Sequence, residues 1–267
     1  MKFPIALQLY SVRDQMEADF EGTLRAVKEM GYDGVEFAGL FGRSAAQVKA
    51  LCAEVGLTPI SAHVPYADLV SDPSILEVYR ELGCKYVVIP YLTEELRPGQ
   101  PGFATFVAQV SDLIARAAAL GIKIGYHNHD FEFVDVDGEM AIDVMYRTLP
   151  ALIPQFDTCW VQVAGESAPA YIRKYADRQE IVHLKDYTGN RTENMYGLIG
   201  LDENGEKAAA SAFELRPVGK GVQDFPAILA ACEDVDMLWV VVEQDEPSMG
   251  LGRMECAKVS IDYLRSL

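Results

Sequence analysis

The sequence has little positive charge. Its 23 Lys and Arg residues stand against 40 Asp and Glu residues, which gives a formal net charge of −17. Such a surface repels phosphate backbones, so no nucleic-acid partner is expected. No apolar run approaches the roughly 20 residues that span a bilayer, and the opening stretch MKFPIALQLYSVRD fits a first strand better than a signal peptide. These absences predict a cytoplasmic protein without membrane contact.

Paired cysteines are also missing. The cysteines are odd in number, lie far apart and form no C-x-x-C motif; they are Cys52, Cys84, Cys159, Cys232 and Cys256. This distribution indicates free thiols in a reducing compartment. No Pro/Ser-rich linker divides the 267 residues, a length that barrel folds commonly use as one domain.

The chain does contain a recurring pattern, in which an amphipathic helix, a glycine and an apolar strand follow one another. It reads KEMGYDGVEF, AEVGLTPISAH, RELGCKYVVIP and AALGIKIGYHNH. A glycine just past a helix end is the expected left-handed residue. The predicted strands are 6–12, 34–38, 58–63, 86–90, 122–127, 154–158, 181–186 and 238–244. Eight strand–helix units predict a parallel sheet closed into one (β/α)₈ TIM barrel over residues 1–267.

A long polar segment interrupts this pattern near 187–216. We expect it to form a lid or hairpin insertion over the mouth of the barrel. The same segment offers a contact surface for a second subunit, so a homo-oligomer is a further expectation.

Histidine is scarce, and all four histidines fall at the predicted carboxyl ends of strands. They are His63, His127, His129 and His183. The carboxyl ends of the strands carry the active site in TIM barrels. One histidine alone is more often structural, but four of them beside carboxylates inside apolar strands indicate a functional site. A carboxylate in a stretch such as LWVVVEQ is costly to bury unless it is paired or bound to a metal.

Three of the candidate metal ligands come from neighbouring predicted strands. Asp157, His183 and Glu243 lie at the ends of strands six, seven and eight. A fourth ligand from the stretch GYHNHDFEF (125–133) would complete an arc around one cation. Carboxylates with an imidazole suit Mn²⁺, Mg²⁺ or Co²⁺, and Zn²⁺ is a further option.

Taken together, the motifs resemble the sugar phosphate isomerase/epimerase superfamily, the xylose isomerase-like TIM barrels. The resemblance covers nearly the whole chain and rests on LQLYSVRD, GVEFAG, SAHVP, GYHNHDFEF, FDTCW, HLKD, PVGKGVQDFPAIL and VVVEQDE. It implies a carbohydrate substrate and one divalent metal ion held by Glu, Asp, His and Glu from strands five to eight. Asp157, His183 and Glu243 match this set directly.

The sequence departs from the family pattern at two positions. His127 stands where the family usually has the strand-five Glu, and the nearest carboxylate beyond it is Glu132. We predict Glu132 as the fourth ligand and keep His127 as the alternative. Trp160 replaces a histidine found in many relatives, which argues against a site for several metal ions.

The resemblance implies a metal-dependent sugar isomerase or epimerase that acts through an enediolate. Glu243, together with Glu132 or His129, is predicted to transfer the proton, and Lys185 to hold a hydroxyl or the developing oxyanion. Substrate contacts are expected from Tyr10, Glu36, His63, His127, Trp160 and Arg216. The same intermediate permits loss of water, so an inosose or keto-glycoside dehydratase is an alternative. A catalytically silent sugar-binding barrel is another.

Overall fold

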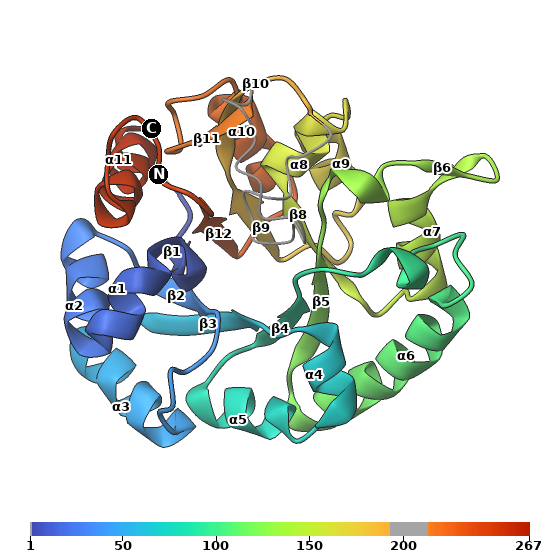
Figure 1. The fold of residues 1–267 in the computed structure, drawn as a ribbon, viewed down its shortest axis with the longest axis horizontal. Helices are drawn as coiled ribbons and strands as arrows, with labels where there is room; N and C mark the ends of the chain where they lie inside the picture. The colour runs from blue at the N-terminus through green and yellow to red at the C-terminus, as the bar shows by residue number, and fades with distance from the viewer. Residues whose placement is uncertain (1, 193–212) are drawn as a thin grey trace.

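The computed structural model describes residues 2–192 and 213–267, and its centre is a closed barrel of parallel strands (Figure 1). The strands are β1 (Ile5–Gln8), β2 (Gly34–Phe37), β3 (Thr58–His63), β4 (Tyr86–Ile89), β5 (Lys123–His127), β8 (Ile153–Asp157), β9 (Ile181–Leu184) and β12 (Trp239–Val242). They follow one another around the barrel in the order β1-β12-β9-β8-β5-β4-β3-β2. The predicted single-domain TIM barrel is confirmed.

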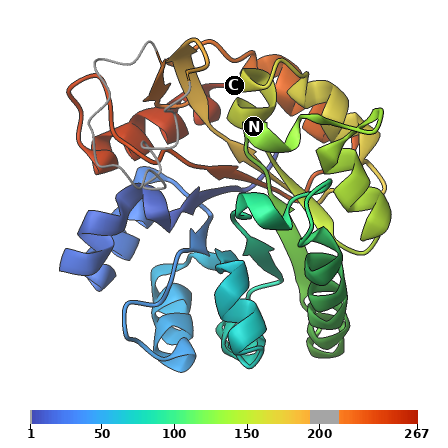
Figure 2. The same ribbon diagram turned by 45° about the vertical axis from the view of Figure 1, so that its right-hand side comes forward.

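Helices form the outer layer of the barrel. In Figure 2 those drawn from blue through green stand side by side outside the strands. They are α1 (Arg13–Ala18), α2 (Phe20–Met30), α3 (Ala45–Val55), α4 (Tyr66–Ser71), α5 (Ile75–Leu82), α6 (Phe103–Leu120), α7 (Ala141–Thr148), α8 (Thr158–Val163), α9 (Ala168–Lys174), α10 (Phe225–Asp234) and α11 (Arg253–Ser266). Short 3₁₀ helices are η1 (Leu9–Val12), η2 (Glu94–Leu96) and η3 (Asp130–Glu132).

The predicted glycines at the ends of helices are confirmed. Gly31, Gly56, Gly83 and Gly121 cap α2, α3, α5 and α6 with left-handed φ angles of 107°, 82°, 109° and 73°. A residue with a Cβ rarely adopts this conformation, and this is why the glycines mark the helix ends in the sequence.

Three predicted strands, 6–12, 181–186 and 238–244, run at least two residues past the end of the observed barrel strand. The first strand ends at Gln8, and Leu9–Val12 form η1 because the Gln8 side chain accepts a hydrogen bond from the backbone N–H of Tyr10 at 3.0 Å. The predicted strand 181–186 divides after Leu184, and Asp186 begins another strand. Past Gln8 the buried apolar residues Leu9 and Val12 continue, so the composition there resembles a longer strand. Past Leu184 the buried residues are the charged Lys185 and Asp186.

Two short antiparallel ribbons accompany the barrel. One pairs β6 (Asp135–Val136) with β7 (Glu139–Met140), and the other pairs β10 (Asp186–Gly189) with β11 (Phe213–Arg216). Residues 193–212 lie outside the described residues, so the lid over 187–216 stays a prediction.

Helix α6 is long and apolar enough to cross a membrane by length and composition alone. It carries Asp112 and Arg116, which pair with each other on its exposed side. Its buried side chains, Phe106, Val110, Leu113 and Ala117, face the interior of the protein. This is the ordinary amphipathic arrangement of a helix in the outer layer of a barrel.

Candidate metal centre and pocket

Four buried side chains converge at the carboxyl ends of adjacent strands. His127 ends β5, Asp157 ends β8, His183 lies in β9, and Glu243 follows β12. One donor atom from each lies within 4.8 Å of the corresponding atoms of the others. The four strands are consecutive neighbours around the barrel, and Asp157 is directly opposite His183 in the register. The fold therefore gathers two imidazoles and two carboxylates at one point.

The imidazole of His127 faces the two carboxylates. Its Nε2 lies 3.7 Å from Asp157 Oδ2 and 3.9 Å from Glu243 Oε2. Burial lowers the pKa of His127 well below its ordinary value; the positive charges of His183, His63 and Lys185 act in the same direction, and Glu243 opposes them. A neutral imidazole offers a lone pair to a metal ion, so His127 is suited to act as a ligand.

Glu36 lies inside the barrel, where it orients His183. His183 Nε2 lies 2.6 Å from Glu36 Oε1, while Nδ1 lies 3.1 Å from Glu243 Oε2. The remaining partners of the Glu36 carboxylate, at 2.5 to 3.1 Å, are Gln8, Ser61, Gln155 and His63. Burial alone would raise the pKa of Glu36. The imidazoles of His63 and His183 outweigh this effect and hold the pKa of Glu36 well below its usual range. Carboxylates of this kind commonly orient metal-binding histidines.

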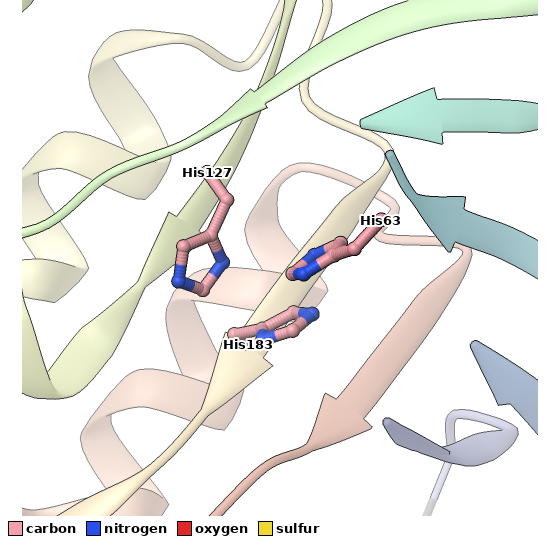
Figure 3. A group of neighbouring side chains, drawn as sticks. All are labelled: His63, His127 and His183. Carbon is pink, nitrogen blue, oxygen red and sulfur yellow. The ribbon is translucent and has the colours of Figure 1, made fainter. Parts of the chain in front are cut away.

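A second possible ligand group consists of three histidines. His63, His127 and His183 each place one ring nitrogen within 4.8 Å of the others. The rings of His63 and His183 are stacked with their centroids 5.2 Å apart (Figure 3). Nε2 of His63 lies 2.7 Å from Gln155 Oε1, and Nε2 of His183 contacts Glu36. Because these nitrogens are already engaged, the group with Asp157 and Glu243 is the better site for a cation.

Lys185 brings a buried positive charge to the same place. Its Nζ lies 3.2 Å from Asp157 Oδ2, 2.9 Å from Glu243 Oε2 and 2.8 Å from Asp245 Oδ2. Burial alone would lower the pKa of Lys185, but these three carboxylates raise it well above its ordinary value. Lys185 is therefore charged, and its ammonium group is held in one position.

The chemistry of the group fits a divalent cation. Three buried carboxylates surround the single lysine, which leaves negative charge to balance. Asp157 Oδ2 accepts no hydrogen bond within the described part of the chain; its near neighbours are the Lys185 ammonium at 3.2 Å and His127 Nε2 at 3.7 Å. Burial alone would lower the pKa of His183, but Glu36 and Glu243 raise this pKa to about 10. A metal ion that binds His183 Nδ1 therefore competes with a proton for that nitrogen.

Glu132, predicted as the fourth ligand, is not in this group. Its carboxylate accepts hydrogen bonds from the Tyr126 hydroxyl and, at 2.7 Å, from the backbone N–H of His129. Burial raises the pKa of Glu132 to about 7 against the opposing effect of these bonds. The chain turns into η3 directly after β5, and this turn directs Glu132 to its own strand instead of to Asp157.

We expect Glu132→Gln to leave Mn²⁺ affinity within about threefold of the parent and to lower the free energy of unfolding by about 1–2 kcal/mol. An amide can accept one of the two hydrogen bonds, but its NH₂ then faces the other donor. Metal titration and chemical denaturation measure the two effects, with the exposed Glu54→Gln as the matched control. A hundredfold loss of affinity would instead place Glu132 in the ligand set.

Two members of the four-residue group, His127 and Glu243, line a cavity of about 570 Å³. Of the residues predicted to contact substrate, Tyr10, His63 and His127 line it, together with His129, Lys185 and Glu243. Glu36 is not brought to the cavity, as described above. Nor is Trp160, whose buried ring stacks on Phe213 at 5.8 Å. Arg216 pairs with Glu214 on β11.

Sequence reasoning did not assign roles to several residues of the site. Asp245 lines the cavity and contacts Lys185. Asn128 Oδ1 accepts a hydrogen bond of 2.9 Å from the backbone N–H of Asp157 and so links the ends of β5 and β8. Gln155 connects His63 to Glu36. Their positions in the sequence could have identified these residues, since each lies within two residues of a predicted ligand.

The fold and the site together define a TIM barrel with a polar centre at the carboxyl ends of its strands. The chain belongs to the xylose isomerase-like TIM barrel family, which it matches over residues 24–267. A curated relative is an inosose dehydratase of Geobacillus kaustophilus. The two sequences are 26% identical over an alignment of 272 residues, gaps included, which covers 91% of this chain and 86% of the relative.

Solved structures share the same architecture. A sugar phosphate isomerase/epimerase from Parabacteroides distasonis superimposes with a TM-score of 0.74 at 19% identity, covering 98% of this chain and 93% of the other. A 3-keto-D-glucoside 4-epimerase from E. coli gives a TM-score of 0.70 at 16% identity, covering 100% of each chain. At these identities the structures establish the fold.

Proposed function

We propose that this protein is a divalent-metal-dependent enzyme that moves a proton next to the carbonyl of a keto-sugar, with epimerisation or isomerisation as the result. The observation that carries the proposal is the buried group of His127, Asp157, His183 and Glu243, of which His127 and Glu243 line the cavity. A metal ion held by these residues would act as a Lewis acid toward the carbonyl oxygen and a neighbouring hydroxyl.

The ammonium group of Lys185 supplies a second positive charge at the cavity wall. It is buried and fixed by three carboxylates, so it needs no rearrangement when negative charge develops on a substrate oxygen. Preorganised donors of this kind stabilise an enediolate more effectively than water does. We assign Lys185 to this oxygen.

The side chains that transfer the proton must line the cavity, where they can contact the substrate. Glu243 and His129 both do so, whereas Glu132 does not. Glu243 is the proposed base that removes the proton beside the carbonyl, and His129 the group that returns a proton. Glu132 contributes indirectly, because its hydrogen bond to the His129 backbone fixes the position of that residue.

Dehydration is the second candidate function. It is favoured by the inosose dehydratase of Geobacillus kaustophilus, whose similarity covers 91% of this chain. The same enediolate can lose a hydroxyl group from the next carbon when that hydroxyl is protonated. The two functions therefore share the first step and differ in which oxygen or carbon receives the proton.

Solvent exchange tests the shared first step. In D₂O, protein loaded with Mn²⁺ is expected to introduce deuterium into a ketose, a 3-keto-glucoside or an inosose, and chelation is expected to stop this. Mass spectrometry then separates an epimer or isomer from a product that has lost water. If protein with one Mn²⁺ per chain exchanges no substrate of the panel, the silent sugar-binding barrel is the better description.

A further inference from the structure

The cavity has two chemically different sides. Its charged side is formed by residues on β5, β9 and β12 and just beyond them, including His127, Lys185 and Glu243. Its other side is formed by the segments that follow β2, β3 and β4. The lining there is mostly apolar and includes Leu40, Val64, Pro65, Ile75, Val78 and Pro90, while Asp68, Tyr79 and Tyr91 supply its polar atoms. The two sides are continuous, so one ligand can contact both.

A simple sugar does not match the apolar side. Nearly every carbon of a sugar carries a hydroxyl, and a buried hydroxyl without a partner is costly. Among the described residues that line the cavity, the polar groups on the apolar side are the exposed carboxylate of Asp68 on α4 and the hydroxyls of Tyr79 and Tyr91, too few partners for a second sugar ring. A volume of about 570 Å³ lies within the range of sites for drug-sized ligands. The cavity thus has room for a substituent beyond the sugar.

Helix α5 contributes an apolar face to this side. Ile75 and Val78 are three residues apart, so they lie on the same face of the helix. Val78 is 39% exposed, whereas most large apolar side chains of the described chain are buried. Apolar surface that is left open beside a polar centre is a common feature of binding sites.

We infer that the substrate is a keto-sugar that carries a bulky apolar substituent, such as the aromatic aglycone of a glycoside. The sugar lies at the charged side, and the substituent lies against Ile75, Val78 and Val64. The inference rests on the proposed function for the sugar part. The assignment of the apolar side stands on its own lining residues.

Binding of two unreactive glycosides tests the inference without turnover. Calorimetry of Mn²⁺-loaded protein with phenyl and methyl β-D-glucopyranoside is expected to show at least about tenfold tighter binding of the phenyl compound, since its ring covers apolar surface. Val78→Gln and, separately, Ile75→Gln are expected to reduce this ratio to about twofold or less. The matched control is Leu238→Gln, because Leu238 is 47% exposed but precedes β12 at the opposite end of the barrel; it should keep the parent ratio.

The outcomes separate this inference from the proposed function. Equal binding of the two glycosides, or a phenyl preference that persists in both α5 variants, would overturn the inference even if keto-sugars exchange deuterium. A phenyl preference lost only in the α5 variants supports the assignment of the apolar side, and it does so even if no keto-sugar exchanges; that exchange failure would overturn only the keto-sugar part. Val78 is partly exposed, so Val78→Gln is compatible with folding, and circular dichroism checks this.

Discussion

Asp157→Asn is expected to lower the affinity for Mn²⁺ by at least about a hundredfold, because changes to residues that merely orient metal ligands already cost about 10–100-fold. A neutral amide is a poorer ligand for a hard cation than a carboxylate. Asp157 Oδ1 also accepts hydrogen bonds from the backbone N–H groups of Cys159 and Trp160 and so caps α8. Asparagine keeps this cap, so the melting temperature should change little.

Metal titration with elemental analysis measures this effect, and Asp234→Asn is the matched control. Asp234 forms an exposed ion pair with Arg173 and lies on α10, away from the cavity. The control is expected to bind Mn²⁺ like the parent. If Asp157→Asn also retains one tightly bound Mn²⁺ per chain, Asp157 is not a ligand.

Lys185→Met is expected to lower kcat by about 10²–10³-fold, the usual cost of removing one preorganised donor to a developing oxyanion. The same change should leave metal affinity undiminished or raise it, because a positive charge beside Asp157 and Glu243 has been removed. A lower kcat together with tighter metal binding distinguishes this role from a structural one.

Steady-state kinetics on the substrate found by the exchange panel and Mn²⁺ titration provide the two measurements. Lys258→Met is the matched control, since Lys258 pairs with Asp262 on the exposed face of α11. Weaker metal binding in Lys185→Met would mean that Lys185 supports the ligand group, and an unchanged kcat would remove it from the mechanism.

The barrel was predictable because its signals are local. Apolar strands, amphipathic helices and glycines at helix ends repeat along the chain, and Gly31, Gly56, Gly83 and Gly121 all adopt the expected conformation. Barrel geometry then brings the carboxyl ends of strands together. That is sufficient to place Asp157, His183 and Glu243 near one another without knowledge of any side-chain contact.

The direction of individual side chains was not predictable. His127 and Glu132 are five residues apart, and only the turn into η3 determines which of them faces Asp157. Glu36 also lies in a strand near the mouth, yet its contacts direct it inward to His183. Sequence spacing identifies which residues reach the mouth of the barrel. Their partners depend on local backbone turns and on hydrogen bonds between distant strands.

Anomalous diffraction from crystals grown with Mn²⁺ tests the central claim most directly. The account predicts one Mn²⁺ peak per chain, in coordination distance of His127, Asp157, His183 and Glu243, with Lys185 beside it. A peak bound by Glu132, a peak among His63, His127 and His183 without the carboxylates, or no peak in a crystal containing Mn²⁺ would contradict it.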